Sequence, residues 1–440
     1  MINNILHNAL LASNKNNKFD WNTPLTFTAK EAGSTITLVA IKNSLGLPVI
    51  DGLQYRTNIN SDWLTYTISD TTGDTITLTN VGDYVQFKNT NDKLSLNIGC
   101  YVQFVMSGTI AAAGNIQSML NYSYSCTDFC YCSMFKDCTS LTKAPELPAI
   151  TLAEYCYAHM FEGCTSLTKA PELPATTLAK DCYFSMFVDC TSLTKTPKLP
   201  TTTLAIECYS HMFHGCSGLV SAPKLPATTL SGYCYSSMFA YCTSLKTAPE
   251  LPVTTLAKSC YRNMFYGCTS LSSAPELPAI TLADHCYSGM FDGCSGLVSA
   301  PELPATTLAK SCYSSMFVDC TSLSSAPELP VTNLVTGCYD CMFNGCTSLS
   351  SAPELPATTL VDGCYWGMFN RCTSLNYIKV GFTNWDSKNE YTMSTEKPTY
   401  RWLGSVSPTG TFVCPPALPI KYETDYIPSG WTVQTIESNV

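Results

Sequence analysis

The chain has 440 residues, a formal net charge of −9 and only 13% charged residues. Nucleic-acid binding requires clustered Lys and Arg to neutralise phosphates; no such cluster occurs, so we expect no nucleic-acid partner. No apolar stretch approaches the ~20 residues that a membrane-spanning helix needs, so we also expect no membrane insertion.

Residues 1–11 lack the basic start and the apolar run of about 7–15 residues that mark a secretory signal. Two explanations stay open. Either a leader has been removed, or the protein leaves its cell without the secretory route, as a virion protein does on lysis; Met1 favours the second. We expect residues 1–22 to form a polar N-terminal docking segment.

Residues 23–120 are expected to form a β-sandwich module of the immunoglobulin-like kind. Short runs rich in β-branched and aromatic residues alternate polar and apolar positions, at a spacing of about 8–15 residues, which is typical of an antiparallel sandwich. The runs are residues 25–28, 35–39, 63–68, 75–78, 84–87 and 101–105.

Ten copies of Cys-Tyr-x-x-Met-Phe-x-x-Cys follow at a fixed period of 26 residues, from residues 130–138 to residues 364–372. A unit of this size cannot bury its own apolar face and must stack on copies of itself. The period therefore predicts, over residues 121–376, a right-handed-type solenoid of ten 26-residue coils.

The repeat that begins at Cys156 shows how one coil is expected to fold. Its apolar residues fall at i, i+1, i+4, i+5 and i+8, which predicts a helix of about two turns. Residues 165–170 predict a short strand that ends at Pro171, because proline cannot donate to a sheet. Stacked coils would form a parallel sheet on one side and a row of short helices on the other. The expected fold class is mainly β with short helices.

The chain has 25 cysteines, of which twenty occupy the two repeat positions. Two cysteines of one repeat are too far apart on a helix to form a bridge, whereas equivalent cysteines of neighbouring coils could approach bonding distance. We expect buried, reduced thiols that serve packing, with sporadic disulfides between coils as the alternative. Cys-x7-Cys is not a zinc spacing, so we expect no metal and no cofactor.

Residues 377–440 lose the period and are expected to form a C-terminal cap, because a solenoid needs a cover over its last apolar face. Trp385, Trp402, Phe412 and Trp431 supply bulk for it. The alternative is a platform on which tryptophan rings stack against sugars.

One repeat position carries glutamate in seven coils and lysine in two. Stacked carboxylates resemble the paired acids of a glycosidase or a calcium site, but an acid/base pair needs two unlike environments, and a repeat gives every member the same one. We interpret the charges as solvated edge charges and expect no enzyme; a glycoside hydrolase is a remote alternative. The acidic members are Glu146, Glu172, Glu250, Glu276, Glu302, Glu328 and Glu354, and the basic ones are Lys198 and Lys224.

The block Phe-Ala-Tyr-Cys-Thr-Ser-Leu at residues 239–245, followed by a predicted strand and a proline, resembles the BspA-like leucine-rich repeats of bacterial surfaces. This resemblance covers residues 121–376. The 26-residue period and the Pro-Glu-Leu-Pro insert depart from the family's usual unit. With its N-terminal β module and Trp-rich end, the full chain also looks like an appendage protein of tailed phages of gut bacteria, which implies attachment rather than chemistry.

Our leading hypothesis is a non-enzymatic virion appendage, a fibre or decoration protein, that presents the solenoid for attachment to the host surface. The alternative is a bacterial cell-surface or extracellular adhesin. We expect other virion proteins to bind the N-terminal region, a host surface glycan or protein to bind the solenoid, and the chain to form a homo-oligomer. The candidate binding surface comprises Lys143, Lys169, Lys195, Lys246, Trp385 and Trp402.

Overall fold

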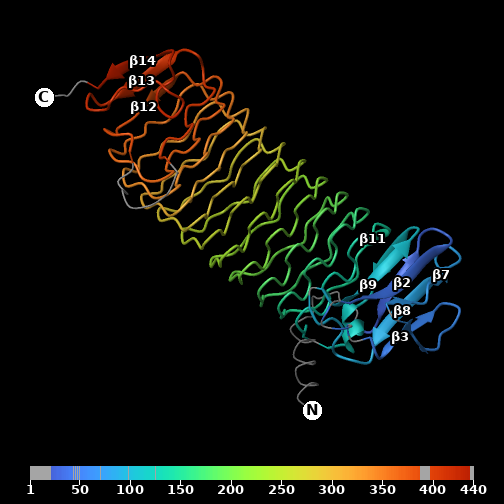
Figure 1. Cartoon of the computed structure of the whole chain (residues 1–440). Helices are drawn as coiled ribbons and strands as arrows, with labels where there is room; N and C mark the ends of the chain where they lie inside the picture. The colour runs from blue at the N-terminus through green and yellow to red at the C-terminus, as the bar shows by residue number, and fades with distance from the viewer. Residues whose placement is uncertain are drawn as a thin grey trace.

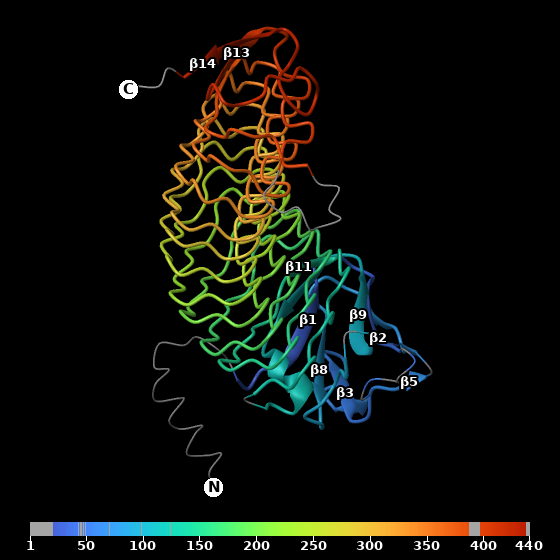
Figure 2. The same ribbon diagram turned by 60° about the vertical axis from the view of Figure 1, so that its left-hand side comes forward.

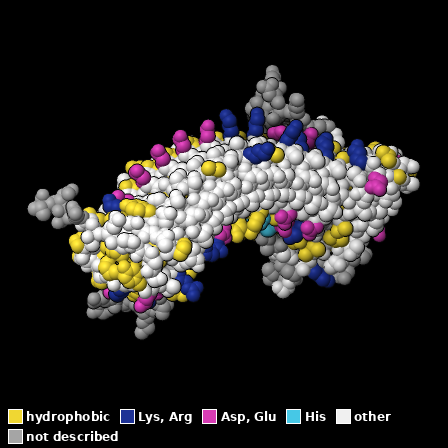
Figure 3. Space-filling model, turned by 90° about the horizontal axis from the view of Figure 1, so that it is seen from above, with side chains coloured by type: hydrophobic (Ala, Val, Ile, Leu, Met, Phe, Trp, Pro, Cys, Tyr) yellow, Lys and Arg dark blue, Asp and Glu magenta, His cyan; other side chains and the backbone are white. Residues whose placement is uncertain are grey.

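The computed structural model describes residues 21–436 except 43, 45, 47, 49, 70, 98, 124 and 387–396. The N-terminal β module lies at one end of a long stack of coils, and a small sheet closes the other end (Figure 1). Seen from above, the body is arched, with one convex and one concave edge (Figure 3). Most of the predicted docking segment, residues 1–20, lies outside the described residues.

The N-terminal module contains two sheets. The strands of the first, in spatial order, are β11 (Leu141–Lys143), β10 (Ile110–Ala113), β1 (Leu25–Ala29), β8 (Tyr84–Asn89), β3 (Leu53–Thr57) and β4 (Leu64–Thr65). Those of the second are β5 (Ile68–Ser69), β6 (Thr72–Gly73), β2 (Ser34–Ile41) and β7 (Ile76–Leu78), with β9 (Tyr101–Ser107) also paired to β2. All these pairs are antiparallel except β10 with β11.

The two sheets share a core of alternating buried side chains. Phe27 of the first sheet packs edge-on against Phe104 of the second, with ring centroids 4.8 Å apart. The run at residues 63–68, expected as one strand, is split between β4 and β5, which belong to different sheets. Buried Tyr66 lies between them; its hydroxyl accepts from the Leu38 N–H at 2.8 Å and donates to the Asp74 carbonyl at 2.7 Å. The immunoglobulin-like assignment stays a prediction.

A short 3₁₀ helix, η1 (Ile116–Leu120), leads from the module to the first coil. Its five residues are all buried, and the Asn115 side chain caps its start by accepting the Gln117 N–H at 2.9 Å. β10 pairs with β11, which is part of the first coil, so the module and the solenoid share a sheet. Figure 2 shows β11 at this junction between the coils and the module.

The predicted row of short helices is wrong. Among the described residues of the repeats, the Cys-Tyr-x-x-Met-Phe-x-x-Cys segments form consecutive tight turns. In the second coil, Tyr155, His159 and Gly163 have φ of 53°, 55° and 71°. A right-handed helix requires negative φ throughout, so a left-handed residue at every fourth position excludes it. The apolar pairs therefore follow a period of four residues rather than 3.6.

Hydrogen bonds between coils compensate for this unusual backbone. The Met160 N–H donates to the Tyr157 carbonyl at 3.3 Å within the coil, whereas the Tyr157 N–H donates to the Cys182 carbonyl of the next coil at 3.0 Å. The same alternation recurs along the stack. Each non-glycine residue in the left-handed region costs roughly 1–2 kcal/mol of conformational free energy. The bonds between coils offset this cost, because they pair backbone N–H groups that would otherwise be buried without a partner.

The predicted parallel pairing between coils is present, but it is reduced to isolated bridges. Lys169 pairs with Lys195, and Thr151 pairs with Thr177, each in parallel register. Prolines such as Pro171 and Pro174 lack an N–H and interrupt any longer ladder. The described chain is thus mainly β with almost no helix.

The tyrosine, methionine and phenylalanine of every repeat are buried, as predicted. Rings of successive coils stack, with centroid distances of 5.5–6.0 Å for tyrosines 131 to 365 and 5.3–5.9 Å for phenylalanines 135 to 369. Removing one ring therefore disturbs two neighbours.

All 25 cysteines are free thiols, and all but Cys341 are buried. From the second repeat onward, the second thiol of each repeat donates to the phenylalanine carbonyl of the preceding coil at 3.0–3.1 Å, as Cys242 does to Phe213. Burial raises the pKa of Cys242 to about 12. Because the thiolate is the reactive form, these thiols are inert at neutral pH.

The C-terminal residues continue the stack in a degenerate form. The Phe369 N–H donates to the Trp402 carbonyl at 2.8 Å, in the manner of one coil to the next. On the other side, β12 (Tyr377–Lys379), β13 (Gly410–Cys414) and β14 (Trp431–Thr435) form a parallel three-stranded sheet. The last apolar face is therefore covered by this partial coil and sheet.

Candidate functional site

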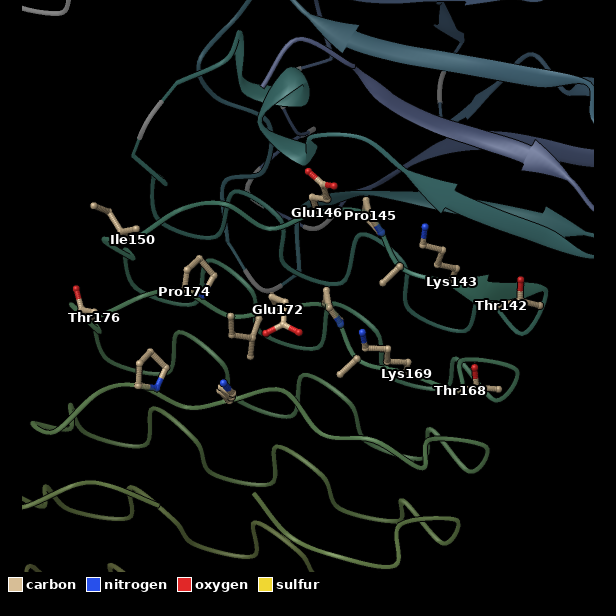
Figure 4. Close-up of a pocket in the computed structure, with 16 residues that line it drawn as sticks. Thr142, Lys143, Pro145, Glu146, Ile150, Thr168, Lys169, Glu172, Pro174 and Thr176 are labelled. Atoms are coloured by element: carbon tan, nitrogen blue, oxygen red, sulfur yellow. The ribbon is translucent and has the colours of Figure 1, made fainter. Parts of the chain in front are cut away.

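A groove of about 1050 Å³ lies on the proline-bearing face of the first three coils, beside the N-terminal module (Figure 4). Prolines such as Pro145, Pro174 and Pro200 line it, together with Ile150. The prolines, which recur in most coils, keep this part of each coil out of the hydrogen-bonded stack. Its surface therefore combines apolar rings with charged side chains.

Three lysines and two glutamates contribute the charges of this groove: Lys143, Lys169, Lys198, Glu146 and Glu172. Figure 4 shows Lys143 and Lys169 side by side, with Glu172 between Lys169 and the wall at Pro174. Lys143 and Lys169 are exposed. Exposed charges interact weakly in water, so the lysines remain available to a ligand rather than being consumed by the two carboxylates.

The structure brings only some of the predicted lysines together. Lys143, Lys169 and Lys195 occupy one position of three successive coils, and Lys169 and Lys195 form a backbone bridge. Lys143 and Lys169 line the groove, and Lys195 lies next to Lys169 just outside its lining. Lys246 is two coils further on and one position earlier in the repeat, so it is separate from this group.

Lys198 lines the groove although it was not among the predicted binding residues. Its signal was present in the sequence, because it replaces glutamate at the charged repeat position. Along the convex edge in Figure 3, a run of acidic side chains gives way to basic ones. The glutamates at this repeat position in the later coils are all exposed: Glu250, Glu276, Glu302, Glu328 and Glu354.

Trp385 and Trp402 must be removed from the candidate binding surface. They are 2% and 0% exposed, and their rings pack against each other with centroids 6.1 Å apart. The indole N–H of Trp385 donates to the Pro419 carbonyl and that of Trp402 to the Tyr426 carbonyl, both at 2.8 Å. A ring that binds a sugar needs an open face, and these two rings cover the end of the solenoid instead.

Little in the described residues suggests reaction chemistry. In that part of the chain, no group of three or more His, Cys, Asp or Glu side chains is arranged to hold a metal ion. No helix of that part is long and apolar enough to span a bilayer. The best-placed histidine, His159, bonds the Glu162 carboxylate at 2.5 Å on the surface of a turn.

A family model for the BspA-type leucine-rich-repeat region matches the chain in six copies, over residues 130–272, 233–350 and 259–394. Together these matches span more than half of the chain and include every coil of the solenoid. A search of curated proteins finds no match.

Proposed function

This chain belongs to the BspA-type leucine-rich-repeat family, and we propose that it is a non-enzymatic attachment protein whose groove binds a ligand on a host surface. The observation that carries this proposal is the position of Lys143, Lys169 and Lys198 in one groove of a protein with net charge −9. A local excess of lysine in an acidic chain favours an anionic ligand, because opposite charges steer association.

The shape of the groove supports this assignment. Its volume of about 1050 Å³ is slightly above the ~300–1,000 Å³ typical of ligand sites. Apolar proline side chains and Ile150 line it together with the lysines. We infer a ligand with both acidic groups and apolar surface, such as an acidic glycan or an acidic protein segment of the host surface.

We propose that the protein is a virion appendage, with other virion proteins bound to its N-terminal region and with several copies joined in a homo-oligomer. Several weak sites on one particle gain affinity through avidity, which suits an exposed groove. We also propose the more detailed description of the fold, a β-sandwich followed by a right-handed-type solenoid of ten coils. A cell-surface adhesin would use the same groove.

Mass spectrometry distinguishes the two locations. Purified virions and the host cell envelope are compared for peptides of this chain, normalised to a known virion protein and a known envelope protein. Enrichment in virions supports the appendage. Enrichment in the envelope, with none in virions, would replace it by the adhesin.

A further inference from the structure

A second hollow, of about 720 Å³, lies on the turn side of the last coils, away from the lysine groove. One wall is the stacked pair Trp366 and Tyr400, whose ring centroids are 5.7 Å apart with planes 15° from parallel. Trp366 is 37% exposed, in contrast to the buried Trp385 and Trp402. Polar side chains form the remaining rim: Lys310, Ser311, Thr336 and Asp340.

The hollow exists because large and small side chains meet at one repeat position. The third residue of successive coils is Ser288, Ser314, Asp340 and then Trp366. Equivalent side chains of neighbouring coils stack on one another, but Trp366 follows the much smaller Asp340 of the preceding coil. The face of the indole toward that coil is therefore not covered by a ring of equal size, which leaves space for the hollow.

The floor is open for a related reason. The residue before the first cysteine of each coil carries a side chain in most coils, including Tyr155, Glu207 and His285. In the last coils it is glycine, at Gly337 and Gly363, and both glycines line the hollow. Their φ values of 62° and 59° fit the left-handed region that every coil needs at this position, so glycine leaves the backbone path unchanged.

The aromatic wall is fixed by the backbone. The Trp366 carbonyl accepts the Cys341 N–H at 2.7 Å, and the Trp366 N–H donates to the Gly363 carbonyl at 3.3 Å. The Tyr400 carbonyl accepts the Gly367 N–H at 2.8 Å, so both residues belong to the bonded stack of coils. A ligand that binds here does not have to order the rings first, which lowers the entropic cost of binding.

We propose that this hollow is a saccharide subsite, in which a pyranose ring packs its C–H face on Trp366. Its hydroxyl groups bond to the rim, where the Asp340 carboxylate accepts and the Lys310 ammonium donates. A ring with one apolar face and a polar edge matches an aromatic wall beside a polar rim. The biological role of this subsite rests on the proposed attachment function. Sugar binding itself does not, because the hollow is a different surface from the lysine groove.

The test is a titration of the full chain labelled with 5-fluorotryptophan and followed by 19F NMR. The chain has six tryptophans, and Trp366→Phe assigns the resonance in question. The probes are the methyl pyranosides of glucose, galactose, mannose and N-acetylglucosamine. We expect at least one to shift the Trp366 resonance saturably, with a dissociation constant of about 1 mM, and to leave the buried Trp385 and Trp402 unmoved.

Affinity for that sugar, measured by saturation-transfer NMR on unlabelled protein, should fall at least about tenfold in Trp366→Ala. The matched control is Tyr377→Ala, which removes an exposed aromatic ring from β12 on the sheet side and should leave the affinity unchanged. Trp366→Ala should still fold and show a cooperative thermal unfolding transition, because the Trp366 side chain is 37% exposed and lies outside the buried ring stacks.

The proposal is overturned if none of the four sugars shifts Trp366 at about ten times the expected dissociation constant, a result that needs no variant to fold. Equal affinity in Trp366→Ala and the parent would also overturn it. If the sugar test fails but the protein still binds host cells, the proposed function of the lysine groove is unaffected. If the lysine groove instead proves not to bind host cells, the sugar titration can still be interpreted, because it reports on a separate surface.

Discussion

The ring of Phe104 in strand β9 stacks on Phe135 of the first coil, with centroids 5.4 Å apart and planes 9° from parallel. The Phe104 N–H donates to the Met134 carbonyl at 2.8 Å, and the Cys138 thiol donates to the Phe104 carbonyl at 3.0 Å. These are the contacts that one coil makes with the next. The N-terminal module is therefore the cap of the solenoid as well as a β module.

Replacing Phe104 by alanine should destabilise the protein by about 3–5 kcal/mol, because the cavity lies within the continuous ring stack. Urea unfolding measures the free energy. The matched control is Val105→Ala in the same strand, whose side chain is 50% exposed and which should change stability by less than about 0.5 kcal/mol. Two separate unfolding transitions, of which Phe104→Ala shifts only one, would show that the module and the solenoid fold separately.

The thiols should all be free. Alkylation under denaturing, non-reducing conditions, counted by intact mass, should modify all 25 cysteines. Under native conditions we expect almost no modification, because the buried thiols are closed to the reagent and burial raises the pKa of the repeat thiols such as Cys242. Half-buried Cys341 should react first, although burial together with Asp340 raises its pKa to about 12. Fewer than about ten free thiols after denaturation would refute the packing role.

Asp292 should make stability depend on pH. Burial, and secondly the charge of Asp319, raise its pKa to about 7, far above the value of about 4 expected when the chain is unfolded. Between these values the folded state binds more protons than the unfolded state, so stability falls as pH rises from about 4 to about 7 and stays reduced above.

Asp292→Asn should therefore gain stability at pH 8 and none at pH 3. The expected gain is about 1–2 kcal/mol, well below the unscreened value, because the side chain keeps contact with solvent. Thermal unfolding of both proteins across this pH range measures it. Asp319→Asn should recover only part of the gain, since burial is the larger cause. A gain of the same size at pH 3 would argue against titration.

Oligomerisation should use the free edge of the first sheet of the N-terminal module. One edge of its first sheet is already paired to the solenoid through β11, which leaves β4 at the other edge, with Leu64 39% exposed. Edge strands that expose apolar side chains favour pairing with another chain. In sedimentation velocity, Leu64→Lys should convert the oligomer to monomer, whereas Ile59→Lys in a nearby exposed loop should not. A monomeric parent would refute self-association at any edge.

The sequence predicted the stacked repeat because the period is strict and every coil buries the same residues. It misplaced the helices, because apolar pairs at i, i+1, i+4 and i+5 fit both a helix and a series of four-residue turns. The residue types at Gly163 and Asn263, which tolerate positive φ, were the signal for turns.

The contacts between module and solenoid could not be predicted, since Phe104 and Phe135 belong to different sequence patterns. For the candidate sites, Lys143 and Lys169 were found by their repeat position, and Lys198 could have been found in the same way. Trp366 could have been found as an aromatic residue at a repeat position that is usually small. Burial of Trp402 depends on how the cap folds, which the composition does not reveal.

The most direct test of the attachment function is binding of the fluorescently labelled full chain to intact host cells, measured by flow cytometry. The triple variant Lys143→Glu, Lys169→Glu and Lys198→Glu is compared with Lys246→Glu, an exposed lysine outside the groove. We predict that the triple variant loses at least about tenfold in affinity, and that Lys246→Glu binds like the parent. Binding of the triple variant at parental affinity would contradict the account.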